Sequence, residues 1–170
     1  MKRHLIKAAL AAVVLFVWGF LSWAVLPWHN AVANKFVDEI AVESVLQIAA
    51  PKNGVYYLPF NPDDHKPGRT AAFVNVLPQG FRRGMGAMMA MAVVGQFLSA
   101  LLVLYLLKQA ALSTYWKRVR FAAVTGGAIG FISHFPYWNW FGFSTAYVAV
   151  IVLDSVIAWT LAGLVLARKE

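Results

Sequence analysis

Long runs of uncharged, apolar residues constrain this chain more than any other feature. They cover residues 8–27, 84–107 and 121–167, and the third run contains a single formal charge, Asp154. An α-helix rises 1.5 Å per residue, so about 20 apolar residues cross the ~30 Å hydrocarbon core of a bilayer. The third run is long enough for two crossings. The sequence therefore predicts an integral membrane protein.

The composition excludes the main alternatives. Of the 170 residues, 61% are apolar and 13% are charged, whereas soluble domains carry about 25% charged residues. So few charges cannot cover the water-exposed surface of a soluble globular enzyme. Disordered chains are poor in apolar and aromatic residues, so disorder is excluded as well.

We predict an all-α membrane protein whose residues 1–170 form a single membrane domain, a bundle of four transmembrane helices. The helices are expected near residues 8–27, 85–107, 117–135 and 143–166. Pro136, Asn139 and Gly142 predict a turn over residues 136–142 between the last two helices. The uncharged part of the third helix is short, and its basic side chains at positions 118 and 120 extend it by snorkelling.

A segment of residues 28–83 separates the first two helices and is too long to be a simple connector. Residues 34–50 have the pattern of an amphipathic helix, with acids in its first turns. Residues 55–58 and 72–76 read as two strands of a β-hairpin, joined by the polar loop 61–70. A lone hairpin is marginally stable in water, so it is expected to pack on the amphipathic helix or on the membrane surface.

The distribution of bases predicts the orientation. With the N-terminus inside, the inner segments hold nine bases and one acid, while residues 28–83 hold six bases and five acids. The positive-inside rule then places both termini in the cytoplasm and residues 28–83 outside it. Size and topology favour a bacterial inner membrane. The first apolar run exceeds the 7–15 residues of a secretory signal, so it is interpreted as an uncleaved signal-anchor despite Ala31-Val32-Ala33.

Asp154 is the leading candidate for a functional residue. It is expected near mid-bilayer, where a carboxylate costs ~2.5–3.5 kcal/mol and marks a functional hypothesis by default. Gln96 is expected at the same depth in the second helix and is the predicted partner. The alternatives are that Asp154 holds helices together, that it binds a basic residue of a partner subunit, or that it handles protons or ions.

Small residues predict close helix contacts. Gly126 and Gly130 form a GxxxG spacing in the third helix, and Gly84 and Gly86 begin the second.

Three histidines are expected on the outer side: His29, His65 and His134. His29 and His134 are weak candidates for a metal or haem site, since the chain has no HExxH or CxxCH motif and no paired-His spacing. No cofactor is predicted. The neighbouring Trp23, Trp28, Tyr137, Trp138 and Trp140 are expected to form an aromatic belt at the membrane interface.

No nucleophile–base set, phosphate loop or dinucleotide fingerprint is visible. Despite a pI near 10, no basic patch with interleaved aromatics predicts nucleic-acid binding. The first expectation is a non-enzymatic accessory, assembly or stabilising subunit, whose partners are the bilayer and other membrane-protein subunits or further copies of itself. The alternatives are a small oligomeric proton-linked transporter or channel using Asp154, and a redox, metal, haem or quinone-binding module using His29 and His134.

Overall fold

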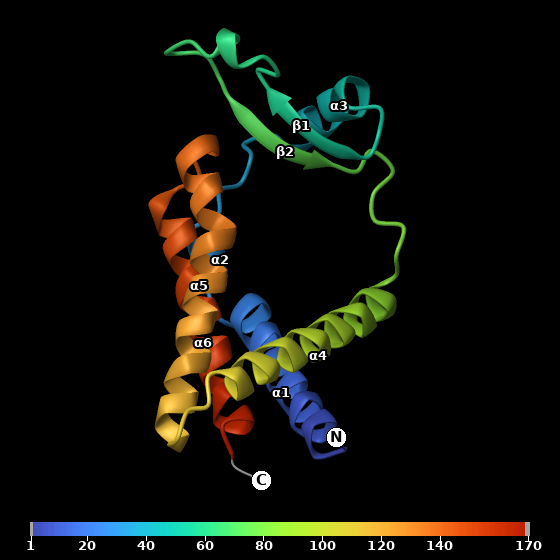
Figure 1. The fold of residues 1–170 in the computed structure, drawn as a ribbon. Coiled ribbons are helices and arrows are strands. Elements are labelled where there is room, and N and C mark those ends of the chain that lie inside the picture. Colours follow the sequence, from blue (N-terminus) through green and yellow to red (C-terminus); the bar gives the residue numbers. More distant parts are fainter. Residues whose placement is uncertain (1, 169–170) are drawn as a thin grey trace. The chain divides into compact units, whose positions relative to one another are not determined.

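The computed structural model describes residues 2–168 and is mostly helical (Figure 1). Lys169 and Glu170, counted above among the cytoplasmic charges, lie outside the described residues. The chain divides into two compact units. We call Met1–Ala33 together with Met85–Glu170 the helical unit, and Asn34–Gly84 the inserted unit.

The described part of the helical unit contains four long α-helices and one short one. Helix α1 (Lys2–Phe20) continues into a π-helical turn, η1 (Leu21–Val25), and the short α2 (Trp28–Ala31) follows; the others are α4 (Met85–Gln109), α5 (Tyr115–Phe141) and α6 (Thr145–Leu166). Within the described residues, three helical segments are long and apolar enough to cross a membrane: Lys2–Val25, Met85–Gln109 and Thr145–Leu166. Helix α5 is as long but less apolar, because bases occupy its first turns and polar residues its last.

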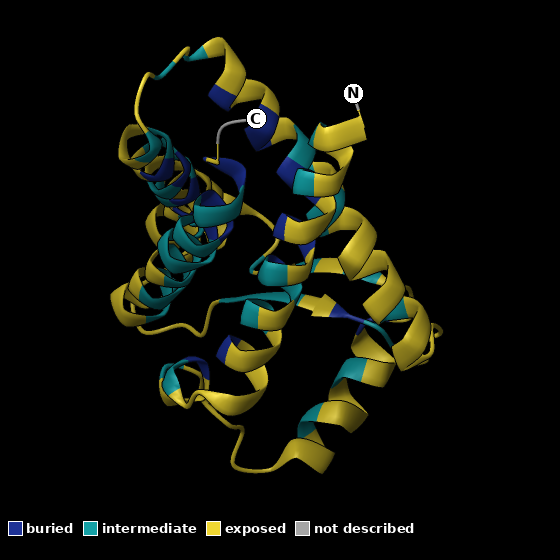
Figure 2. Cartoon of the chain, turned by 90° about the horizontal axis from the view of Figure 1, so that it is seen from below, coloured by how far each residue is buried: buried dark blue, intermediate teal, exposed yellow. Residues whose placement is uncertain are grey.

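Small side chains let these helices approach one another closely. Helices α5 and α6 form an antiparallel hairpin, and α1 packs against both α6 and α4. The core is rich in alanine and is completed by leucine, valine and one tryptophan; it includes Ala8, Ala11, Leu15, Ala100, Leu107, Ala122, Trp159 and Leu166. Figure 2 shows the buried residues along the facing sides of the helices, with the outer faces exposed. This pattern of apolar exposure is expected for helices surrounded by lipid.

The predicted turn over residues 136–142 is wrong, because α5 continues through Pro136 to Phe141. Proline removes one backbone hydrogen bond, a loss that membrane helices tolerate when neighbouring groups compensate. Gly142 ends the helix instead: its φ of 69° is left-handed, and its amide donates to the carbonyl of Tyr137. Glycine adopts this conformation without the steric cost that a side chain brings.

The inserted unit combines one helix with a hairpin. Helix α3 (Glu39–Ala49) begins later than the pattern of residues 34–50 predicted, because the Asp38 side chain caps it by accepting a hydrogen bond from the Ala41 amide at 2.9 Å. Strands β1 (Gly54–Leu58) and β2 (Ala72–Val76) pair antiparallel, with Gly54 opposite Val76. The predicted hairpin is therefore confirmed.

Candidate functional site

Three side chains contact the carboxylate of Asp154 on α6, and two of them donate hydrogen bonds to it. The indole Nε1 of Trp18 and the hydroxyl of Ser22 donate to its Oδ1, at 2.6 and 2.8 Å. Nε2 of His29 lies 3.4 Å from its Oδ2. Both carboxylate oxygens therefore have polar contacts, and the Asp154 side chain is only 15% exposed.

The local fold of the N-terminal segment brings the donors together. Trp18 and Ser22 are four residues apart, so they lie on one face where α1 passes into η1. Helix α2 then returns into the helical unit after Pro27, which leaves His29 only 3% exposed. His29 was expected at the outer end of the first helix. The backward turn after Pro27 instead buries it against Asp154.

The hydrogen-bond pattern assigns the protons around Ser22, which is fully buried. Because its hydroxyl hydrogen points to Asp154, its oxygen accepts from Nε1 of Trp28 and from Nε2 of His29, both at 3.0 Å. Nε2 of His29 therefore carries a proton. Within residues 2–168, Nδ1 of His29 is buried without a hydrogen-bond partner. We call these five residues, Trp18, Ser22, Trp28, His29 and Asp154, the Asp154 cluster.

Two tryptophans fix the ring of His29. Trp23 stacks on it with ring centroids 3.8 Å apart and planes 11° apart, and Trp28 meets it edge-on at 5.5 Å. Trp23 and Trp28 were predicted as parts of an interfacial aromatic belt, but here they hold the imidazole in place. The arrangement also differs from a Ser–His–Asp catalytic triad, in which serine and aspartate contact opposite ring nitrogens. Here both contact Nε2.

The predicted pairing of Asp154 with Gln96 is absent from residues 2–168. Gln96 lines the same cavity as Asp154, but the carboxylate bonds to residues of α1 and α2 instead. Helix α1 packs against both α4 and α6 and so supplies the donors. Equal depth in the bilayer does not determine which helices are neighbours.

The four predicted packing glycines fall into two groups. A Cβ atom at Gly126 would lie 2.6 Å from the Ser155 carbonyl oxygen, and one at Gly130 would lie 3.0 Å from Cα of Val152. Helix α6 therefore rests directly on this face of α5, where the Ser155 hydroxyl also donates to the Gly126 carbonyl at 2.7 Å. At Gly84 and Gly86 an added Cβ would meet nothing within 4 Å.

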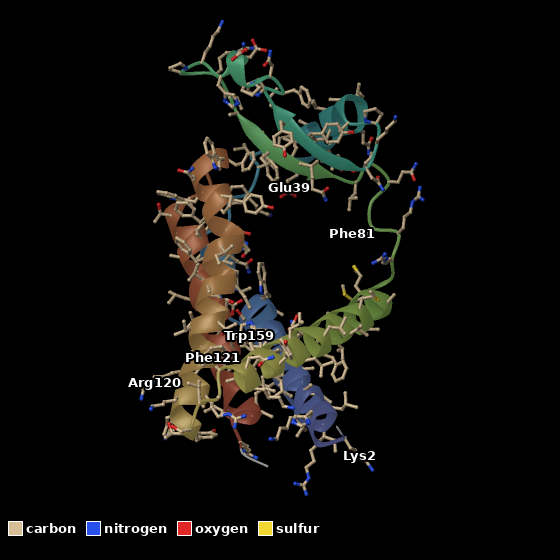
Figure 3. The ribbon with its side chains drawn as sticks, viewed as in Figure 1. Lys2, Glu39, Phe81, Arg120, Phe121 and Trp159 are labelled. Carbon is tan, nitrogen blue, oxygen red and sulfur yellow. The ribbon has the colours of Figure 1, made fainter. Side chains whose placement is uncertain are left out.

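A cavity of about 350 Å³ lies beside Asp154 in the helical unit. Helices α1, α4, α5 and α6 all contribute to its wall, which includes Trp18, Gln96, His134, Tyr147 and Trp159; the last is labelled in Figure 3. Nδ1 of His134 lies 2.7 Å from the Ser133 hydroxyl. Among residues 2–168, no group of three or more histidines and acids is arranged to hold a metal ion.

The sequence did not identify Trp18 and Ser22 as partners of Asp154. Their spacing was a usable signal, because a serine four residues after a tryptophan places two donors on one face of an otherwise apolar helix. No sequence rule indicated that this face meets α6 rather than lipid.

Comparison of the chain with protein-family models, curated proteins and solved structures gives no match.

Proposed function

We propose that all four long helices cross a bacterial inner membrane as a bundle, with both termini in the cytoplasm. The continuation of α5 to Phe141 supports the fourth crossing, because the uncharged residues 121–141 rise about 31 Å as a helix. Lys7 donates to the carbonyl of Arg168 at 2.7 Å, and the Tyr115 hydroxyl donates to that of Leu164 at 3.0 Å. The base-rich ends of α1, α5 and α6 thus lie together, as the positive-inside rule expects of a cytoplasmic face.

Within this topology, we propose that the protein is a non-enzymatic accessory or assembly subunit of a membrane complex. The observation that carries the proposal is the incomplete core of the inserted unit. Its buried apolar residues are Ala50 and Val76 alone, and α3 has no buried residue. Large apolar side chains remain exposed, among them Phe36, Val37, Ile40, Val45, Ile48, Phe60 and Phe81. Exposed apolar surface of this kind is typical of interaction sites.

A groove of about 520 Å³ between α3 and β2 supplies a docking surface in the inserted unit. Its floor is apolar and includes Val42, Leu46 and Val74, while Glu39 and Glu43 line its edge. Among the described residues, the ion pair at this edge joins Glu39 to Lys35 at 4.0 Å, and both side chains are largely exposed. Exposed pairs of this kind contribute little. The groove therefore suits a partner segment with apolar side chains beside a lysine or arginine.

Site-specific photocrosslinking in native membranes tests this proposal. A photoreactive residue at Leu46, in the groove, should give one stoichiometric adduct, and the crosslinked peptide should carry apolar residues next to a base. The same group at Ile48, which is exposed and does not line the groove, should give much less of it.

Charge reversal provides the matched control. The double variant Glu39→Lys, Glu43→Lys should abolish the adduct, while Asp63→Lys, Asp64→Lys, in the exposed hairpin loop, should preserve it. An adduct formed only with a second copy of the chain would assign the groove to a homo-oligomer. Absence of any adduct, together with a monomer in mild detergent, would refute the accessory-subunit proposal.

A second candidate function is proton-linked transport by an oligomer through Asp154. The specific observation in its favour is the hydrogen-bonded series Asp154, Ser22 and His29, which ends at the unpartnered Nδ1 of His29. In liposomes, Asp154→Asn should abolish proton-driven flux. Equal flux in the folded variant would remove this candidate.

A further inference from the structure

The cavity beside Asp154 has the dimensions of a small-molecule site. Its volume of about 350 Å³ falls within the range of roughly 300–1,000 Å³ typical of ligand pockets. Four separate helices of one compact unit form it. It is therefore a feature of the tertiary structure and not a groove along one helix.

The walls of this cavity are mainly aromatic and aliphatic. Trp18, Trp23 and Trp159 contribute indole rings, and Leu15, Ile129 and Ile151 contribute aliphatic surface. Flat aromatic side chains favour stacking with, or edge-on contact to, another ring. Walls of this kind select a ring-shaped ligand over a hydrated ion.

Three polar groups in the wall have unused hydrogen-bonding capacity. The amide of Gln96 and the hydroxyl of Tyr147 make no hydrogen bond within residues 2–168, and His134 uses only Nδ1, with Ser133. Polar groups in an apolar environment are costly unless they are hydrogen-bonded. A ligand that carries carbonyl or hydroxyl oxygens would satisfy them.

The hydrogen bonding of Asp154 indicates which ligand charge the cavity can accept. Its carboxylate already accepts hydrogen bonds from Trp18 and Ser22, and Nε2 of His29 lies 3.4 Å from its second oxygen. The cavity therefore presents no unpaired negative charge to a cation, and no lysine or arginine lines it. A neutral ligand fits these surroundings.

We infer that this cavity binds a neutral quinone or quinol ring attached to an apolar tail. The indoles contact the ring, and Gln96, His134 and Tyr147 bond to its oxygens. The tail extends among the apolar helices.

Gly19 provides a test that leaves the fold intact. It lines the cavity, and an added Cβ there would meet nothing within 4 Å. Gly19→Leu therefore fills the cavity without a clash at Cβ, and it replaces a poor helix former by a good one. Gly95→Leu is the matched control, because Gly95 also lies in a helix with free space around it but outside the cavity.

The experiment measures quenching of tryptophan fluorescence by decylubiquinone, with the full chain in lipid nanodiscs. Saturable quenching is expected for the unmodified chain and for Gly95→Leu, and only the non-saturable background for Gly19→Leu. Gln96→Leu and His134→Phe should each weaken binding by about tenfold, since each removes a hydrogen bond. Decylbenzene, which lacks oxygens, should not displace the quinone.

Two results would overturn the inference. One is the absence of saturable quenching by decylubiquinone in the unmodified chain, or equal quenching in Gly19→Leu. The other is displacement by decylbenzene at equal concentration, which would assign the cavity to lipid tails.

Discussion

Replacing Asp154 by leucine should destabilise the protein, although it removes a carboxylate from an apolar environment. A carboxylate without partners at mid-bilayer costs ~2.5–3.5 kcal/mol, so removing one that faces lipid would stabilise the protein by about that amount. Here Trp18 and Ser22 donate hydrogen bonds to Asp154, and hydrogen bonds to a charged group contribute about 1.5–3 kcal/mol each. The loss of these two bonds, about 3–6 kcal/mol, outweighs the relieved cost of the carboxylate, and a net destabilisation of about 1–2 kcal/mol is expected.

Equilibrium unfolding in mixed detergent micelles, followed by circular dichroism, measures this change. A double-mutant cycle with Trp18→Phe, which removes the indole N–H, should give a coupling free energy of about 1–2 kcal/mol. Asp154→Asn should cost less than the leucine variant, because it retains an acceptor for Trp18 and Ser22. Stabilisation by Asp154→Leu, or additive effects of the two substitutions, would refute the assignment of these contacts.

Three further predictions test the packing and the topology. Gly126→Ala should lower the free energy of unfolding by about 1–3 kcal/mol, because its Cβ would overlap α6. The control Gly95→Ala, in open space, should be neutral or stabilising. Equal losses in the two variants would contradict the packing of α5 on α6. The chain has no cysteine, so single cysteines can report the topology. A membrane-impermeant thiol reagent applied to intact cells should label Asp64→Cys and not Ser113→Cys. The reverse pattern would show that the topology is the opposite of the one proposed. Tyr115→Phe should cost about 1 kcal/mol in the same unfolding assay, since it removes a hydrogen bond to a carbonyl of α6; no loss would show that this bond is not stabilising.

The elements of the fold were largely predictable because their signals are local. Hydropathy predicted four transmembrane helices, of which three are long and apolar enough to cross a membrane, and short runs of strand-forming residues predicted β1 and β2. The turn at Pro136 was mispredicted, because α5 continues through this proline, and whether a helix does so depends on the groups that pack beside it. Local propensity carries no information about those neighbours.

The candidate site was predictable only in part. Asp154 was identified because a lone acid in an apolar helix is costly wherever it lies. Its partner was not, since Gln96 matched it in depth but lies on α4, while α1 supplies Trp18 and Ser22. The contact of His29 with Asp154 could not be predicted from the sequence either, because the burial of His29 depends on the return of α2 after Pro27.

The sequence by itself determined that the chain has long apolar helices, a small polar insertion with two strands, and one acid that requires partners. These properties follow from residue composition and spacing, which act over a few turns of backbone. Only the tertiary structure decided which donors satisfy Asp154 and where a cavity remains beside it. Hydrogen bonds act over about 3 Å, so they depend on which helices pack together, and that packing depends on contacts between residues more than a hundred positions apart.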